Sequence, residues 1–143
     1  MVKAIVIHGP NMNLLGTREV NLYGELTLDV LNGRITDYAA RLDVSVAFVQ
    51  HNSEGEIIDQ IHNSQQEFNY GIINPGAYTH YSLAIRDAIS SVRIPFIEVH
   101  LSNVFAREEF RHKSVIAPVC IGSIAGFGEH SYCMALQYIK NNI

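Results

Sequence analysis

Short apolar runs alternate along the whole chain with segments whose apolar residues recur at helical spacing. The runs that predict strands cover residues 2–7, 44–49, 70–74, 95–101 and 115–121. Continuous apolar runs of this length are typical of strands buried on both faces of a sheet. Because a helical segment separates successive runs, we expect parallel strands with helices packed on both faces of the sheet.

The segments between these runs predict five helices. Thr27 is positioned to cap a helix in which Leu28, Leu31 and Ile35 begin an apolar stripe. Ser-Glu-Gly-Glu at residues 53–56 has the form of a capping box and predicts a second helix. The remaining helical segments are predicted over residues 81–92, 107–111 and 128–140.

This alternation indicates an α/β protein, and the length of 143 residues fits one domain of ~100–200 residues. No linker, repeat or low-complexity segment divides the chain, so we predict a single catalytic domain over residues 1–143. By analogy with other doubly wound folds, we expect a flavodoxin-like five-stranded parallel sheet with strand order 2-1-3-4-5.

Composition and charge exclude several classes of protein. Ten Lys and Arg against 14 Asp and Glu give a net charge of −4, and no basic run exists to bind nucleic acid or an anionic membrane surface. No apolar stretch approaches the ~20 residues that span a bilayer. The apolar run at the N-terminus is too short for a signal peptide. Two cysteines, Cys120 and Cys133, cannot form a disulfide framework, so we expect a cytoplasmic protein.

Polar side chains gather where the predicted strands end, which is the edge at which open parallel sheets bind ligands. Glu98 and His100 are the most informative pair, because residues two apart on a strand point to the same face with ~6–7 Å between their Cα atoms. We expect Glu98 to accept a hydrogen bond from His100 and to fix its tautomer. Two unrelated polar groups at a strand end are the alternative.

The segment 9–25 is long and rich in Asn and Gly, which is typical of a lid over a site. It carries Arg18 and Tyr23, which in isolation would be ordinary surface residues. A phenol is a poor base near neutrality because its ordinary pKa is ~10. A cation at ~4 Å stabilises the phenolate by several kcal/mol, so a close Arg18 would be enough to activate Tyr23.

Other chemistries fit the sequence less well. Residues 9–16 match neither the dinucleotide fingerprint nor the phosphate-binding loop, and the seven histidines lack metal-ligand spacing, so we expect no metal. No lysine is well placed for Schiff-base chemistry among Lys3, Lys113 and Lys140. A binding module for FMN or another small anion and a structural scaffold subunit remain as alternatives.

At these residues the chain resembles the type II 3-dehydroquinate dehydratases over nearly its whole length. His8 and Met12 stand where other members often have Asn and Leu, and Phe105 where some have His. The segments that carry the resemblance are HGPNMNLLGTRE (8–19), LYGE (22–25), INPGAYTHYSLAIRDA (73–88), IPFIEVHLSNVFAREEFRHKS (94–114) and GFGEHSYCMALQY (126–138).

The resemblance implies reversible dehydration of 3-dehydroquinate to 3-dehydroshikimate, in the shikimate (aromatic amino acid) or the quinate pathway. Members of this family remove a proton next to a ketone, pass through an enolate and expel water in an anti elimination. They use no metal, no cofactor and no imine. They assemble as trimers grouped into a dodecamer.

The resemblance also implies roles for residues at matching positions. Tyr23 would be the base, deprotonated with help from Arg18, and Asn11 would hold a water that stabilises the enolate oxygen. His100 would be the acid, held and tuned by Glu98. The substrate-binding residues would be Leu101 and Ser102 for the carboxylate, Asn74, His80 and Arg111 for the hydroxyls, and Asp87 in the site of a neighbouring subunit.

Overall fold

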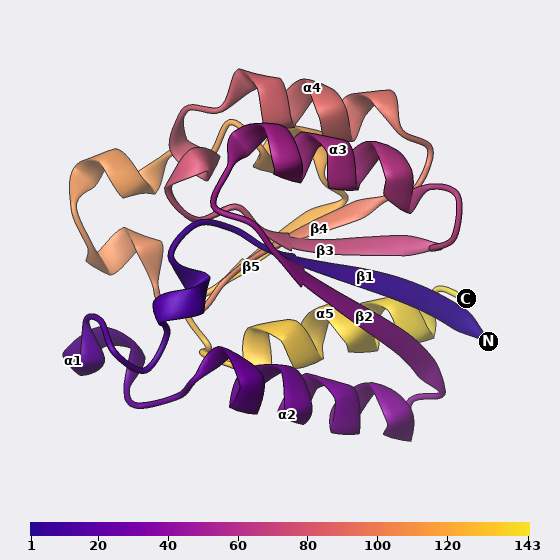
Figure 1. The fold of residues 1–143 in the computed structure, drawn as a ribbon, viewed down its shortest axis with the longest axis horizontal. Coiled ribbons are helices and arrows are strands. Elements are labelled where there is room, and N and C mark those ends of the chain that lie inside the picture. The colour runs from indigo at the N-terminus through magenta and orange to yellow at the C-terminus, as the bar shows by residue number, and fades with distance from the viewer.

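The sheet is the frame of the molecule, and a computed structural model describes it over residues 1–143. All neighbouring strands are parallel, and their order is β2-β1-β3-β4-β5, which confirms the predicted topology (Figure 1). The strands are β1 (Val2–His8), β2 (Val44–Gln50), β3 (Tyr70–Asn74), β4 (Phe96–His100) and β5 (Gly122–Ala125).

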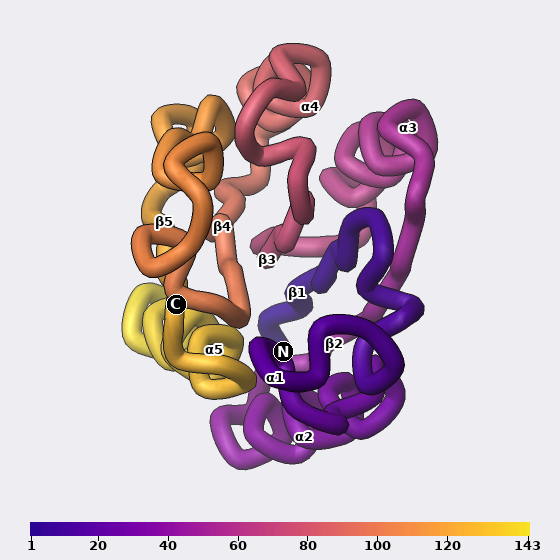
Figure 2. Tube along the Cα trace, turned by 90° about the vertical axis from the view of Figure 1, so that its left-hand side faces the viewer, coloured from indigo at the N-terminus to yellow at the C-terminus, as the bar shows by residue number.

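Helices cover both faces of this sheet. Figures 1 and 2 show α2 and α5 on one face and α3 and α4 on the other. The helices are α1 (Val20–Tyr23), α2 (Leu28–Arg41), α3 (Glu54–Ser64), α4 (Leu83–Ser91) and α5 (His130–Asn141). Five short 3-10 turns complete the chain: η1 (Met12–Leu14), η2 (Gly76–His80), η3 (Val104–Ala106), η4 (Glu109–His112) and η5 (Ala117–Val119). None of the helices combines the length and apolar character needed to cross a membrane.

Hydroxyl side chains start three of the amphipathic helices, α2, α3 and α4. Thr27 accepts the backbone N–H of Val30, and Ser53 accepts that of Glu56, so both predicted caps are confirmed. Ser82 does the same for α4. Each hydroxyl satisfies one of the backbone donors that a helix leaves unpaired in its first turn, which fixes where the helix begins.

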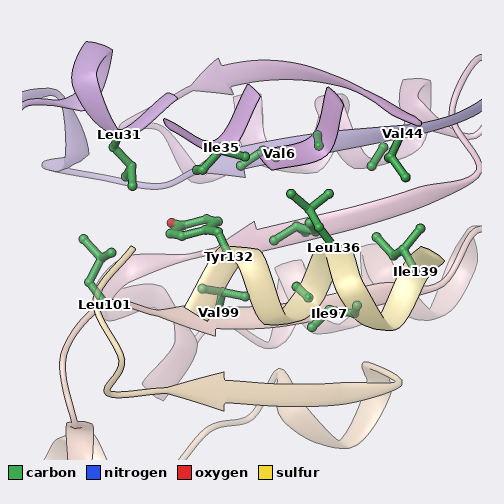
Figure 3. Close-up of a cluster of buried hydrophobic side chains, with 14 of the residues drawn as sticks. Val6, Leu31, Ile35, Val44, Ile97, Val99, Leu101, Tyr132, Leu136 and Ile139 are labelled. Atoms are coloured by element: carbon green, nitrogen blue, oxygen red, sulfur yellow. The ribbon is translucent and has the colours of Figure 1, made fainter. Parts of the chain in front are cut away.

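The sheet divides the core into two clusters. On the α2–α5 side, Leu31, Ile35, Tyr132 and Leu136 are fully or almost fully buried against the strands (Figure 3). On the α3–α4 side the buried residues are mostly isoleucines, contributed by β1, β3 and the two helices. Successive side chains along a strand point to opposite clusters, so the central strands β1, β3 and β4 are mostly buried on both faces.

The prediction of a fifth strand over residues 115–121 is wrong. This segment forms the η5 turn, and the strand is Gly122–Ala125. Pro118 has no N–H to donate to a neighbouring strand. The Ser114 hydroxyl accepts hydrogen bonds from the backbone N–H groups of Ile116 and Ala117 at 3.1 and 2.9 Å, so these groups are also not available for strand pairing. β5 is an edge strand that pairs only with β4, so it is partly exposed and lacks the apolar signature of a central strand.

Candidate active site

A cavity of about 130 Å³ opens at the carboxyl edge of the sheet, beneath the segment 9–25. That segment, predicted as irregular, contains the short η1 turn and the single-turn helix α1. Most of the predicted site residues line this cavity: Asn11, Arg18, Tyr23, Asn74, His80, His100, Leu101, Ser102 and Arg111. Arg107 lines it as well. The structure therefore brings together residues that are up to a hundred positions apart in the sequence.

Glu98 and His100 form the buried hydrogen-bonded pair that their spacing predicts. Nε2 of His100 lies 2.6 Å from Oε2 of Glu98. The carboxylate also accepts hydrogen bonds from the hydroxyls of Thr79 at 3.0 Å and Ser114 at 2.7 Å. Its side chain is only 2% exposed, so these three donors replace the water that it loses on folding.

The environment of Glu98 keeps its carboxyl ionised. Burial raises the pKa of Glu98, but the hydrogen bond and charge of His100 and the hydroxyls of Ser114 and Thr79 outweigh it and hold that pKa below its usual range. An ionised Glu98 accepts hydrogen bonds only, so Nε2 of His100 carries a proton. This leaves Nδ1 as the ring nitrogen of His100 that is available to a ligand.

Tyr23 is the last residue of α1, and its phenol faces two guanidinium groups. Nη1 of Arg107 donates to the phenol oxygen at 2.9 Å and to the Ser102 hydroxyl at 3.3 Å. The guanidinium carbons of Arg18 and Arg107 lie 5.9 and 5.7 Å from the centre of the Tyr23 ring. Arg107 is therefore the cation that contacts the phenol oxygen, whereas Arg18 lies over the ring, and its help in deprotonating Tyr23 stays a prediction.

Glu19 links the two arginines. Its Oε2 lies 3.1 Å from Nη2 of Arg18 and 3.6 Å from Nη2 of Arg107. The Glu19 backbone has a φ of 46°, a left-handed conformation that is uncommon for a residue with a side chain. The carboxylate thereby connects the segment that carries the phenol to the loop after β4.

Asn11 reaches the cavity from a second left-handed position, with a φ of 69°. The side chain of Asn52 accepts the Asn11 N–H at 3.0 Å, and Gln50 donates to both Asn52 and the carbonyl of Gly9. Gly9 must lack a side chain, because a Cβ there would lie 2.7 Å from the Asn74 carbonyl oxygen. The strand ends therefore hold Asn11 through their own amides.

His80 and Arg111 approach from the other side of the cavity. Nδ1 of His80 donates to the carbonyl of Lys113 at 2.7 Å, which leaves Nε2 free. Nε of Arg111 binds the Glu108 carboxylate, and this hydrogen bond is the main reason that the pKa of Glu108 lies below its usual range. Asp87 is exposed on α4 and does not line the cavity, so within one chain it does not join the site.

A second, larger cavity of about 550 Å³ adjoins the first at His100 and lies beside the edge strand β5. It shares His80, His100 and Arg111 with the first cavity, and exposed Phe105 and Phe127 line its rim. No group of three or more His, Cys, Asp or Glu side chains is arranged to hold a metal ion. The polar side chains that line the first cavity carry imidazole, phenol, guanidinium, amide and hydroxyl groups.

Arg107 lines the cavity and contacts Tyr23, but it is not among the residues that the sequence predicts for the site. It lies in a stretch with two glutamates and a second arginine, a composition that is typical of an exposed charge cluster. Nothing local marks it, because its partner Tyr23 lies 84 positions away. The one usable signal was that it follows the strand that carries Glu98 and His100.

Comparison with known proteins agrees with this geometry. The family model described as dehydroquinase class II matches residues 2–140. The proteins named 3-dehydroquinate dehydratase from Caldanaerobacter subterraneus subsp. tengcongensis and Caldicellulosiruptor bescii are 56% and 57% identical to this chain. These alignments cover 98% of this chain in both cases, and 95% and 97% of the two relatives.

Solved structures give the same result. The crystal structure of the type II dehydroquinase from Butyrivibrio crossotus superposes with a TM-score of 0.94 at 49% identity, and the match covers 98% of this chain and 97% of that one. The type II dehydroquinase from Propionibacterium acnes also reaches a TM-score of 0.94, at 40% identity. The sequence match and the superposed fold agree, and the chain belongs to the class II dehydroquinase family of hydro-lyases.

Proposed function

We propose that this chain catalyses the reversible elimination of water from 3-dehydroquinate to give 3-dehydroshikimate, with Tyr23 as the base and His100 as the acid. The observation that carries the proposal is that both side chains face one cavity, each with a charged partner suited to its role. Tyr23 has the Arg107 guanidinium at its oxygen, and His100 has the buried Glu98 carboxylate at Nε2.

In the first step, the Tyr23 phenolate takes the proton on the carbon next to the ketone. The electron pair of that C–H bond forms the enolate, whose negative charge rests on the former ketone oxygen. Arg107 and Arg18 favour the phenolate because each places a positive charge against the phenol. Asn11, held at the cavity rim, would bind a water that donates to the enolate oxygen.

In the second step, the enolate re-forms the ketone and the hydroxyl on the next carbon leaves as water. His100 donates the required proton from Nδ1, while Nε2–H remains bonded to Glu98. The ionised carboxylate stabilises the imidazolium before transfer and fixes the ring orientation. Hydroxide is a poor leaving group, so proton donation at this point lowers the barrier.

The substrate is an anion, and the cavity offers suitable partners for it. We assign the carboxylate to the loop at Leu101 and Ser102, and the ring hydroxyls to Asn74, His80 and Arg111. Asp87 would act from a neighbouring copy, in a dodecamer built from trimers. The reaction would serve aromatic amino acid biosynthesis or quinate breakdown in the cytoplasm, a setting that suits the free thiols Cys120 and Cys133.

The test follows the appearance of enone absorbance when 3-dehydroquinate is added to purified protein freed of metal with a chelator. We expect turnover by the wild type, a loss of ~10²–10⁴ in kcat for Tyr23→Phe, and no inactivation by borohydride in the presence of substrate. A folded wild type without turnover would refute the proposal. Covalent trapping of substrate on a lysine would contradict the mechanism, and a yellow, inactive protein would favour a flavin-binding module.

A further inference from the structure

A chain of polar groups that begins at half-buried Asn32 runs from α2 through the core to the active-site cavity. It begins at Asn32, passes through His8 at the end of β1 and Tyr132 on α5, and ends at Asn74. His8 and Tyr132 are fully buried, and Asn74 is 5% exposed and lines the cavity. His8 and Asn74 are register partners on adjacent strands, so the chain spans the two central strands.

The geometry of the chain is continuous. Nε2 of His8 lies 2.7 Å from Oδ1 of Asn32, and Nδ1 lies 3.4 Å from the Tyr132 hydroxyl. Nδ2 of Asn74 lies 3.4 Å from the same hydroxyl. The His8 ring stacks on Phe48 with its plane inclined by only 4°, and Tyr132 packs between α5 and the sheet (Figure 3).

Each donor in this chain has a defined direction. The backbone N–H of Gly76 donates to Oδ1 of Asn74 at 3.1 Å, so Nδ2 of Asn74 must be the group that donates to the Tyr132 oxygen. The Tyr132 proton is then directed to Nδ1 of His8, which accepts it only if the His8 proton is on Nε2. Nε2 in turn donates to Asn32, which completes the series.

The protonation state of His8 agrees with this direction. Burial lowers the pKa of His8 to about 4, and the hydrogen bond to Asn32 opposes this only in part. The imidazole is therefore neutral near pH 7 and carries a single proton. At one end the amide oxygen of Asn32 accepts a hydrogen bond from Nε2–H of His8, and at the other end the backbone N–H of Gly76 fixes the orientation of the Asn74 amide.

We propose that His8, acting through the Tyr132 hydroxyl, is a positioning residue that holds the Asn74 amide so that it presents an N–H, and not its carbonyl oxygen, to the substrate. One Asn74 N–H is bound to Tyr132, and the amide nitrogen also lies 3.5 Å from the sulfur of Met12, a weak acceptor at the cavity wall. A substrate hydroxyl oxygen replaces that weak partner with a strong one. The inference rests on the proposed function, because it assigns Asn74 to substrate binding.

The test compares Tyr132→Phe with Tyr38→Phe. Tyr38 packs against the same core cluster and also donates a long hydrogen bond, of 3.3 Å to Gln137, but it lies away from the cavity. We expect Tyr132→Phe to raise KM for 3-dehydroquinate by about tenfold with kcat changed by less than about threefold, because one neutral hydrogen bond orients the amide. Tyr38→Phe leaves both constants unchanged.

A double-mutant cycle separates positioning from stability. In an Asn74→Ala background, Tyr132→Phe is expected to raise KM no further, because the group that it positions is absent. His8→Phe keeps the stacked ring but removes the acceptor, and it serves as a second variant if Tyr132→Phe does not fold. Nitrogen NMR of the wild type is expected to show the His8 proton on Nε2.

The outcomes distinguish the inference from the proposed function. A wild type without turnover overturns the proposed function and with it the role of Asn74. An active wild type in which Tyr132→Phe behaves as Tyr38→Phe, or in which the effects of Tyr132→Phe and Asn74→Ala add, overturns the positioning role alone. A His8 proton on Nδ1 also overturns it.

Discussion

Arg107 is the residue whose removal tests the electrostatic account of the site most directly. Arg107→Met keeps a long apolar side chain but removes the guanidinium that lies 2.9 Å from the Tyr23 oxygen. The Arg107 side chain is only 10% exposed, so its charge is weakly screened. We expect the variant to fold normally and to lose stabilisation of the phenolate.

The magnitude follows from Coulomb's law. Two unit charges ~4 Å apart interact by ~4 kcal/mol at the effective dielectric constant of ~20 that suits such sites. Glu19, 3.6 Å from the Arg107 guanidinium, already offsets part of this attraction. A net loss of about 2–3 kcal/mol remains, which corresponds to a fall in kcat at pH 7 of roughly 30- to 150-fold.

The pH profile identifies the cause of that loss. If Arg107 stabilises the phenolate, the deficit of Arg107→Met shrinks as pH rises toward 9.5, because hydroxide then removes the phenol proton. Arg107→Lys, which retains a cation, is expected to recover part of the activity. The matched control is Arg41→Met, since Arg41 also lies over a tyrosine, 5.2 Å from the centre of the Tyr38 ring, but far from the cavity.

Two results would refute this reasoning. A wild-type kcat for Arg107→Met would show that the contact with the phenol oxygen contributes nothing to the base. A large deficit that is equal at pH 7 and pH 9.5 would assign Arg107 to substrate binding through Ser102.

Three further predictions concern the buried groups. Glu98→Gln is expected to lower kcat by ~10²–10³, because a neutral amide no longer stabilises the His100 imidazolium. The melting temperature is expected to change little, because the amide oxygen still accepts a hydrogen bond from Ser114. An unchanged kcat would contradict this role of Glu98. Gly9→Ala is expected to unfold at a lower temperature and to lose activity, since its Cβ would lie 2.7 Å from a backbone oxygen. The pKa of His8 is about 4 in the folded protein and near 6.5 in the unfolded chain, so the free energy of unfolding is expected to fall by about 3 kcal/mol as pH drops from 7 to 4. Urea titrations of the wild type and of His8→Phe at several pH values measure this loss. The same dependence of unfolding free energy on pH in both proteins would refute it.

The sequence was most informative where the geometry is local. The period of two along a strand placed Glu98 and His100 on one face without knowledge of the fold, and the caps at Thr27 and Ser53 follow the same local rules. The central strands were also predictable, because burial on both faces requires continuous apolar residues.

The sequence failed where contacts are distant or where burial is incomplete. The edge strand β5 was not predicted, because it is partly exposed and lacks a continuous apolar run. The apolar segment before it was predicted as the strand instead, although it contains Pro118 and forms the η5 turn. The contact of Arg107 with Tyr23 depends on how two loops meet, which no periodicity encodes. The hydrogen bond between His8 and Tyr132 could not be predicted either, because the sequence around each residue indicates only a buried side chain.

The sheet acts as a partition between the two halves of the site. Glu98 and His100 project toward the α3–α4 side with Phe96, whereas Asn74, His8 and Tyr132 lie on the α2–α5 side. Substitutions of His8 or Tyr132 share no hydrogen-bond partner with substitutions of Glu98, so their effects on the free energy of the transition state are expected to add. The effects of His8 and Tyr132 substitutions are not, because both act through one hydroxyl. The orientation of the Asn74 amide can therefore change through substitutions on the α2–α5 side while the Glu98–His100 pair on the other side keeps its hydrogen bond.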